Sequence, residues 1–170
     1  MGVGKSCLFV RLFCGEFSHK HVPATVEWNE IEFPIDGYEV SVNMMDLAGT
    51  DDFAEMRLSW LAKCDAYILM YSLASRESFL KVERYRKEIL LTERGEDLPI
   101  LLVGNQLDRD DDREVSEEEG RQKALEWGYS YTEMSVKYNV GVSEALRMCV
   151  REIMRTRQTP PSSDPSCSIL

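Results

Sequence analysis

The sequence predicts an α/β protein with a mostly parallel sheet that is covered by helices on both faces. Two nearly continuous apolar runs, residues 66–73 (AYILMYSL) and 99–103 (PILLV), are typical of strands that are buried on both sides. The charged segment between them, residues 76–93, is predicted to be a surface helix. Because strands alternate with helices along the chain, a parallel sheet between two layers of helices follows.

The first third of the chain is predicted to contain a β-hairpin. Two strand-like runs, residues 30–35 (EIEFPI) and 38–45 (YEVSVNMM), flank Asp36 and Gly37, a dipeptide that favours a tight turn. A helix over residues 6–13 and a polar loop over 16–29 are predicted before the hairpin. A second loop over 46–53 and a short helix over 56–63 are predicted after it.

The last third of the chain adds a helix, a strand and a second helix, over residues 116–127, 129–135 and 142–157. Ser116 and Glu119 have the spacing of a capping box, which marks the start of the first of these helices. Proline and serine dominate after Arg157, as in flexible segments. The sequence therefore predicts one domain over residues 1–157 and a flexible tail over residues 158–170.

The composition is that of a soluble globular domain. Of 170 residues, 44% are hydrophobic and 29% are charged, and the net charge of −10 argues against nucleic-acid binding, which needs clustered Lys and Arg. No run of 18 apolar residues is present, so we expect no membrane span, and we expect no secretory signal. Five scattered cysteines without a C-x-x-C pair favour reduced intracellular thiols over disulfides or a zinc site: Cys7, Cys14, Cys64, Cys149 and Cys167.

The N-terminal stretch GVGKS is typical of a phosphate-binding loop. Gly4, Lys5 and Ser6 fit the last three positions of the pattern G-x-x-x-x-G-K-[ST], directly before a predicted helix. Backbone N–H groups at a helix N-terminus favour phosphate, the lysine can reach the β- and γ-phosphates, and the serine hydroxyl can bind Mg²⁺. The candidate phosphate ligands are Gly2, Val3, Gly4, Lys5, Ser6 and Cys7. A flexible loop with a helix cap is the alternative.

Three further short motifs follow predicted strands, at the edge where open α/β sheets bind ligands. The first is DLAG, residues 46–49, in which Asp46 can hold the Mg²⁺ shell and the Gly49 N–H can approach a terminal phosphate. Because Asp and Gly end many strands, this motif gains weight only from its order and spacing relative to the others.

The other two motifs suit a guanine base. In NQLD, Asn105, Gln106 and Asp108 follow the buried strand at 99–103, and the Asp108 carboxylate can accept hydrogen bonds from both the N1–H and the exocyclic amine of guanine. Adenine offers no such pair of donors. In SVK, a backbone N–H can meet the guanine O6; the residues are Ser135, Val136 and Lys137. An ordinary turn is the alternative for each motif.

Together these four motifs resemble those of the Ras-family small GTPases, over residues 1–157. The resemblance implies a P-loop small G-domain fold, binding of GTP and GDP with Mg²⁺, hydrolysis of GTP, and effector, exchange-factor and GTPase-activating partners. PATVE resembles the first switch, with Thr25 meeting Mg²⁺ and the γ-phosphate, and AGTDDFAEMR resembles the second. Phe17 resembles the aromatic residue that lies against the guanine. The resemblance makes Thr50, Gly49 and Lys5 the catalytic candidates, and Ser6, Thr25 and Asp46 the metal ligands.

The sequence departs from the family pattern at two functional positions. Thr50 stands where most members have the glutamine that orients the attacking water, so we expect slow intrinsic hydrolysis that depends on a partner. Gln106 replaces the lysine of N-K-x-D, so we expect weaker nucleotide binding, because the amide brings no charge. "PAT" carries one residue more than the family's P-T, which affects the placement of Thr25.

The resemblance also implies that the first strand of the fold and the first half of the P-loop are missing from this sequence. That strand lies between the strands at 38–45 and 66–73, so its absence would leave backbone groups unpaired. The leading hypothesis is a GTP/GDP-cycling switch. The alternative is a catalytically inert, lipid-anchored interaction module, which the missing strand, Thr50 and Gln106 all favour.

The C-terminal CSIL resembles a prenylation box. A leucine at the last position favours geranylgeranyl on Cys167, and a chance cysteine is the alternative. We therefore expect reversible anchoring to the cytoplasmic face of a membrane, most simply the plasma membrane. MGVGKS also fits the myristoylation pattern, but any P-loop at a chain start generates it.

Overall fold

The computed structural model describes residues 2–15, 26–47, 54–92, 97–157 and 167–169. Its helices and strands, in chain order, are α1 Lys5–Cys14, β1 Val26–Ile35, β2 Tyr38–Leu47, α2 Ala54–Leu61, β3 Tyr67–Ser72, α3 Arg76–Leu90, β4 Ile100–Asn105, the 3-10 helix η2 Leu107–Asp112, α4 Glu117–Trp127, β5 Ser130–Met134, α5 Val142–Arg157 and β6 Cys167–Ile169. The predicted alternation of strands and helices is confirmed.

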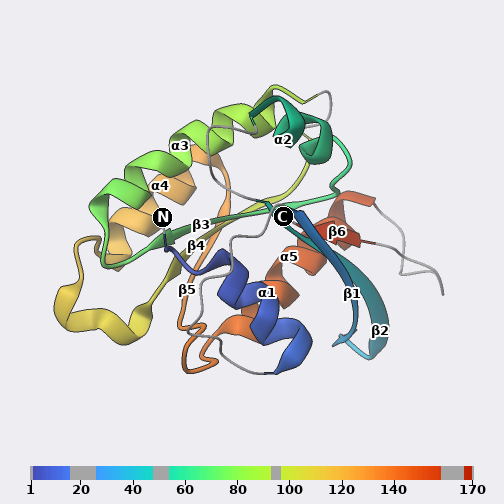
Figure 1. Ribbon diagram of the computed structural model, residues 1–170, viewed down its shortest axis with the longest axis horizontal. Helices are drawn as coiled ribbons and strands as arrows, with labels where there is room; N and C mark the ends of the chain where they lie inside the picture. The colour runs from blue at the N-terminus through green and yellow to red at the C-terminus, as the bar shows by residue number, and fades with distance from the viewer. Residues whose placement is uncertain (1, 16–25, 48–53, 93–96, 158–166, 170) are drawn as a thin grey trace.

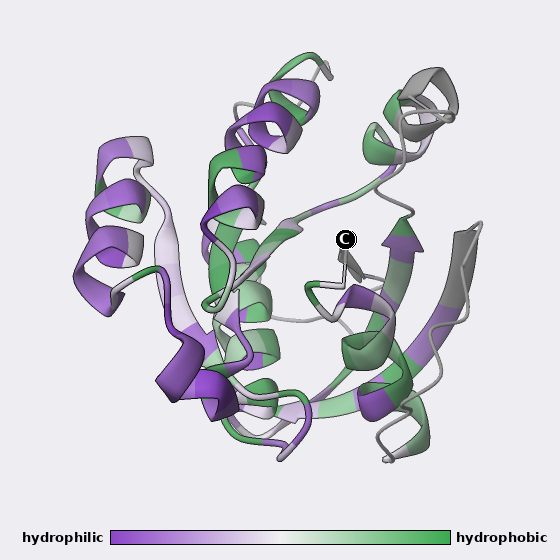
Figure 2. Ribbon diagram, turned by 60° about the vertical axis from the view of Figure 1, so that its left-hand side comes forward, coloured by the Kyte–Doolittle hydropathy of each residue, from purple (hydrophilic) through white to green (hydrophobic). Residues whose placement is uncertain are grey.

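Helices cover both faces of the strands, as the sequence predicts (Figure 1). On one face α1 and α5 pack against β2, β3 and β4 through a core that includes Leu8, Val103 and Leu146. On the other face α2, α3 and α4 pack over a second core that includes Leu102 and Phe79. Hydrophobic residues accordingly concentrate on the strands and on the helix sides that meet them (Figure 2).

The strands form two three-stranded sheets. In one sheet β3, β4 and β5 are parallel, and all six residues of β4 are buried, which explains the apolar run PILLV. In this register Ser72 lies beside Asn105, and Asn105 beside Met134. The three strands therefore end together, and the loops that follow them share one edge.

The other sheet consists of the hairpin β1–β2 and the short strand β6. Asp36 and Gly37 have φ angles of 50° and 88°, which suits the primed turn of a two-residue hairpin. The predicted polar loop over 16–29 is wrong from Val26 onward, because β1 begins there and Val26 pairs with Leu47. Val26 and Trp28 alternate with polar residues as in a strand, but the adjacent polar residues Asn29 and Glu30 interrupt this alternation.

Strand β6 was not expected from the sequence. Cys167, Ser168 and Ile169 pair in parallel with Val42, Asn43 and Met44 of β2, although the sequence placed them in a flexible tail. Among the described residues, no strand precedes α1, and β6 is the strand found beside β2 on the side away from β1. The pairing shows that this edge of β2 is able to accept a parallel strand.

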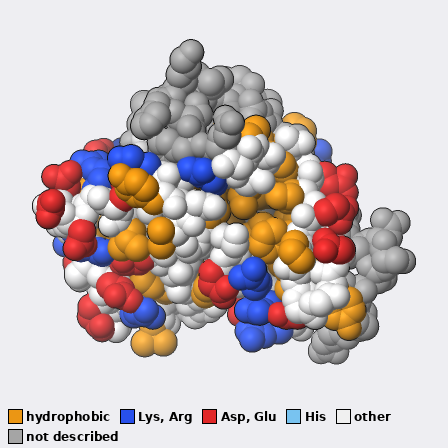
Figure 3. Space-filling view, turned by 90° about the horizontal axis from the view of Figure 1, so that it is seen from below, with side chains coloured by type: hydrophobic (Ala, Val, Ile, Leu, Met, Phe, Trp, Pro, Cys, Tyr) orange, Lys and Arg blue, Asp and Glu red, His pale blue; other side chains and the backbone are white. Residues whose placement is uncertain are grey.

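The surface is of mixed charge. On the face covered by α1 and α5, basic side chains are interspersed with acidic ones over the coloured part of the molecule, and hydrophobic side chains gather near its centre (Figure 3). None of the described helices is both long enough and apolar enough to cross a membrane.

Candidate functional site

Four buried polar side chains mark one edge of the fold. Among the described residues, those of this kind are Asp46, Ser72, Asn105 and Ser135, each at most 6% exposed. They lie at or next to the carboxyl ends of β2, β3, β4 and β5. Polar groups are seldom buried without a role, and this edge is where ligands bind in open α/β sheets. The edge is therefore the candidate functional site.

The phosphate end of this site consists of residues 2–7 and Asp46. Gly4 caps α1 with φ 100° and ψ 18°, a left-handed conformation that favours glycine, and α1 begins at Lys5. The N–H groups of the first helical turn have no partner within the helix, so they are available to an anion. Lys5 is exposed at this end. The helix start predicted directly after Gly4 is thus present, and phosphate binding by these residues stays a prediction.

Asn105 joins the phosphate end to two other loops. Its amide Nδ2 donates to the Val3 carbonyl at 2.8 Å, and its Oδ1 accepts from the Val136 N–H at 3.1 Å. A Cβ atom on Gly4 would collide with the Asn105 amide, so a glycine is needed there for this approach as well as for its φ angle. One buried amide therefore sets the distance between the phosphate loop, β4 and the loop after β5.

Gln106 makes a second connection to the phosphate end. It has a φ of 69°, which is unusual for a residue other than glycine. Its Nε2 donates to the Gly2 carbonyl at 2.9 Å, and its Oε1 accepts from the Ser72 hydroxyl at 2.6 Å. Because glutamine has no charge, its presence here in place of lysine predicts weaker nucleotide binding. The structure shows that the neutral amide still braces the phosphate loop.

The base end of the site consists of residues 105–113 and 135–137. Asp108 lies in η2, and its side chain is 10% exposed. Its Oδ1 accepts from the Ser135 hydroxyl at 2.6 Å, and its Oδ2 lies 4.0 Å from Lys137 Nζ. The two motifs that the sequence assigned to guanine, NQLD and SVK, are therefore brought into direct contact.

Arg11 holds the SVK segment from the opposite side. This residue of α1 donates from Nε to the Val136 carbonyl at 3.1 Å and from Nη2 to the Lys137 carbonyl at 2.8 Å. It also donates to the Gly15 carbonyl at the end of α1. Sequence reasoning missed both Arg11 and Ser72, because neither belongs to a motif and both act over long separations.

Ser6 and Asp46 fit the expected Mg²⁺ site. A hydroxyl and a carboxylate are the hard oxygen donors that Mg²⁺ prefers, next to phosphate oxygens. The Asp46 carboxylate is buried. Burial of the Cys7 thiol in α1, and after it the charge of Asp46, raises the pKa of that thiol. Among the described residues, no three His, Cys, Asp or Glu side chains gather as a metal site.

Several predicted site residues lie outside the described residues. These are Phe17, Thr25, Gly49 and Thr50. Cys167 is described only through its backbone in β6. Cys7, Cys14, Cys64 and Cys149 are free thiols, not disulfides.

An α/β fold with a glycine-capped helix at one end of the site and the shielded carboxylate of Asp108 at the other is typical of a P-loop nucleotide-binding domain. The sequence model of the Ras family matches residues 1–155. The chain belongs to the Ras family.

Two curated relatives support this assignment. The Ras-like protein rasW of Dictyostelium discoideum is 32% identical over 165 residues, which cover 97% of this chain and 76% of the relative. The Ras-related protein O-RAL of Diplobatis ommata is 35% identical over 153 residues, which cover 89% of this chain and 74% of the relative. Ras-family proteins are GTP-binding switches that hydrolyse GTP and bind GTP and GDP with Mg²⁺, and this is the general class of the chain.

Proposed function

We propose that this chain is a guanine-nucleotide switch in signal transduction, with nucleotide held along the edge described above. The observation that carries the proposal is the pair of amide bridges to the phosphate loop, from Asn105 at the end of β4 and from Gln106 directly after it. Asn105 and Gln106 fix the phosphate loop, and the next residues lead directly to Asp108. A ligand that spans both ends must carry a phosphate at one end and a base with two adjacent donors at the other. Guanine nucleotides have both features.

Each residue of the site has a defined part in this proposal. The N–H groups of Gly2 to Cys7 and the Lys5 ammonium hold the phosphates, and Ser6, Asp46 and Thr25 hold Mg²⁺. Asp108 accepts from the guanine N1–H and amine, Phe17 and Gln106 lie against the base, and the segment Ser135 to Lys137 meets O6. In the GTP state Thr25 and Gly49 order the two switch segments, which present a surface to effectors.

We further propose that Thr50 makes hydrolysis slow without a partner. Threonine is shorter than glutamine and lacks its paired donor and acceptor, so it orients the attacking water poorly. Single-turnover hydrolysis of radiolabelled GTP by the purified chain tests this point. Thr50→Gln is expected to accelerate the reaction several-fold. A several-fold acceleration by Thr50→Ala would contradict it, because alanine cannot orient water.

A prenyl group on Cys167 is proposed to hold the chain at the cytoplasmic face of a membrane. The backbone of Cys167 pairs with Val42 in β6, so this strand has to leave β2 before the cysteine can enter a transferase. Cys167→Ser is expected to abolish incorporation of a labelled isoprenoid and to shift the protein from the membrane to the soluble fraction of cells. Equal membrane content of the two proteins would count against the anchor.

The nucleotide content of the purified chain tests the central proposal. Chromatography of the denatured protein is expected to release guanine nucleotide, and removal of Mg²⁺ with a chelator is expected to lower the unfolding temperature and release it faster. Asp46→Asn should reduce this response to Mg²⁺, whereas Glu83→Gln, in an exposed pair with Lys87 of α3, is a matched control. No bound nucleotide and no stabilisation by GTP with Mg²⁺ would favour the alternative, an inert interaction module.

A further inference from the structure

Behind the base end, four side chains form a continuous polar chain that none of the nucleotide motifs includes. Tyr71 of β3 and Tyr131 of β5 bring their hydroxyl oxygens to 2.9 Å. The Tyr131 hydroxyl donates to Glu133 Oε1 at 2.8 Å. Because a phenol has a single proton, Tyr71 is the donor in the tyrosine pair. The direction of donation thus runs from Tyr71 of β3 toward Glu133 of β5.

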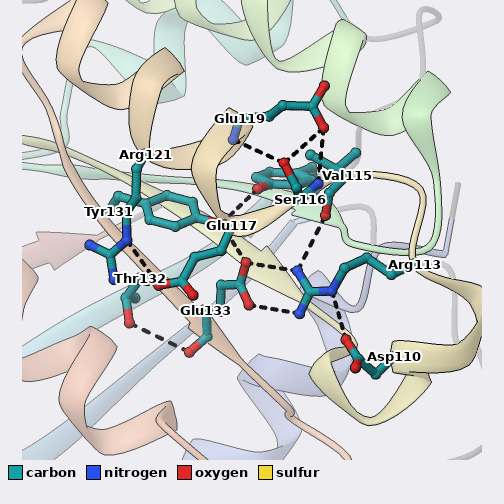
Figure 4. Close-up of polar contacts among 11 residues, drawn as sticks. Asp110, Arg113, Val115, Ser116, Glu117, Glu119, Arg121, Tyr131, Thr132 and Glu133 are labelled. Carbon is teal, nitrogen blue, oxygen red and sulfur yellow. Dashed lines mark hydrogen bonds and ion pairs between the residues drawn. The ribbon is translucent and has the colours of Figure 1, made fainter.

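Arg113 connects this chain to η2, the 3-10 helix that carries Asp108 (Figure 4). Its Nη1 and Nη2 donate to the two Glu133 oxygens at 3.0 and 2.9 Å, and its Nε donates to Asp110 at 2.7 Å. Nη1 also donates to the Val115 carbonyl at 3.2 Å. Only a guanidinium can donate two parallel hydrogen bonds to the Glu133 carboxylate and a third to Asp110 at the same time. A lysine at position 113 could not make all three bonds.

The Arg113–Glu133 pair is better shielded than the surface ion pairs nearby. The two side chains are 21% and 10% exposed, whereas Arg121 and Glu117 of α4 are 59% and 54% exposed. The hydrogen bond from Arg113 to Glu133 is the largest cause that raises the pKa of Arg113. Shielded, bidentate pairs hold their geometry, while exposed pairs contribute little.

Helix α4 closes over the tyrosine hydroxyls. Tyr71 is fully buried, and burial is the largest cause that raises its pKa to about 12. Gly120 of α4 lies so close that a Cβ atom there would collide with both hydroxyl oxygens. The fold thus leaves no space for any side chain at this position. The hydroxyl pair is therefore fixed between β3, β5 and α4, and it fixes one oxygen of Glu133.

We propose that Tyr131, Glu133 and Arg113, with Tyr71 behind them, are positioning residues for guanine recognition. This inference rests on the proposed function of Asp108. Arg113 holds Asp110, two residues after Asp108, and Glu133 precedes by two residues the Ser135 whose hydroxyl donates to Asp108. The Arg113–Glu133 pair therefore ties together the two segments that place the Asp108 carboxylate. Phosphate-binding residues are not part of this link.

The link predicts a loss of base discrimination as well as of affinity. Inosine diphosphate differs from GDP by the absence of the exocyclic amine, so the ratio of their dissociation rates reports how well Asp108 meets that amine. If η2 is released from β5, the carboxylate shifts, and the dissociation rate of IDP relative to that of GDP falls. A variant that only destabilises the fold weakens the binding of GDP and of IDP by the same factor.

Glu133→Gln and Arg113→Lys in the full chain test the proposal, with fluorescent GDP and IDP released in the presence of Mg²⁺. Both variants are expected to release GDP about tenfold faster and IDP about twofold faster, since charge-assisted hydrogen bonds are lost next to the base-binding residue. Tyr131→Phe and Tyr71→Phe are expected to show smaller changes in the same direction. Glu117→Gln, in the exposed pair with Arg121, is the matched control and should change neither rate.

The proposal would be overturned if these variants had a lower unfolding temperature but an unchanged ratio of GDP to IDP dissociation rates. The four side chains would then have a purely structural role. Hydrogen exchange of the Arg109 and Arg113 amides, which donate to the carbonyls of Gln106 and Asp110, gives a readout that needs no nucleotide. Exchange at these amides should accelerate in Glu133→Gln and stay unchanged in Glu117→Gln. If the wild-type chain binds neither nucleotide, the proposed function fails, and equal exchange in all variants would then overturn the positioning link separately.

Discussion

The base end and the phosphate end of the site are built in different ways. At the base end, side chains bind one another as well as the backbone: Ser135 donates to Asp108, and Arg113 holds both Glu133 and Asp110. At the phosphate end, the described contacts are to the backbone carbonyls of Gly2 and Val3. The donors are Gln106, directly after β4, and Asn105, the last residue of β4.

This difference indicates where rigidity originates. The base end is supported by the parallel sheet β3–β4–β5, whose central strand is wholly buried. The phosphate loop is positioned from that sheet through Asn105 and Gln106. Changes at the base end should therefore alter the choice of base, while changes at the bridge should alter the phosphate loop and the stability of the fold together. Four predictions test this division.

The largest effect is expected for Asp108→Asn at the base end. Loss of two charge-assisted hydrogen bonds should weaken the binding of GDP by about 3 kcal/mol or more, which raises its dissociation constant about a hundredfold. An amide can instead donate to the O2 of xanthine, so the affinity for xanthosine diphosphate should rise relative to GDP. Competition of the two nucleotides against fluorescent GDP measures both. Asp112→Asn, in an exposed pair with Arg109, is the control; equal loss in both variants would contradict base readout by Asp108.

Gly4→Ala tests the bridge to the phosphate end. A left-handed alanine is strained by about 1–2 kcal/mol, and its Cβ also displaces the Asn105 amide, so we expect a loss of about 2–4 kcal/mol in the free energy of unfolding and of nucleotide binding. Gly15→Ala is a matched control, because Gly15 has a φ of 69° and nothing within 4 Å of a Cβ atom. Denaturant unfolding should separate the two variants; equal losses would show that strain alone acts at Gly4.

Gly120→Ala tests the support of the base end. Alanine in place of glycine usually stabilises a helix by up to about 1 kcal/mol, but here the Cβ meets the hydroxyls of Tyr71 and Tyr131, so we expect a loss of about 1–3 kcal/mol. Thermal unfolding measures this change. Glu118→Ala, at an exposed position of the same helix, should be close to neutral. A stabilised Gly120→Ala protein would mean that α4 moves away from the sheet freely.

The smallest effect is expected at the acid limit of stability. Hydrogen bonds from Arg76 and from Ser116 lower the pKa of Glu119 from its usual value of 4.5 to about 2. A lowered folded-state pKa contributes stability that is present above about pH 4.5 and is lost as the pH falls toward 2. Glu119→Gln should therefore flatten the dependence of the unfolding temperature on pH in this window. Because the Arg76–Glu119 pair is exposed, added salt should reduce its contribution to stability. The prediction would be wrong if the unfolding temperature of Glu119→Gln changed with pH as steeply as that of the wild type.

The sequence by itself determined the order of the elements and the motifs of the site. Apolar runs, the Asp36-Gly37 turn and the Ser116 capping box depend on local periodicity and local backbone chemistry, and all three form as predicted. The motifs are also local, so Gly4, Asn105 and Asp108 could be assigned before their contacts were known.

Only the tertiary structure decided which side chains support those motifs. Ser72 and Gln106 are 34 residues apart, and Arg11 and Val136 are 125 apart, so no short pattern links them. The same holds for the pairing of β6 with β2, since three residues have no strand signal without a partner edge. Such contacts arise when packing brings the ends of several strands to one edge, where a buried polar group is stable only with a hydrogen-bond partner.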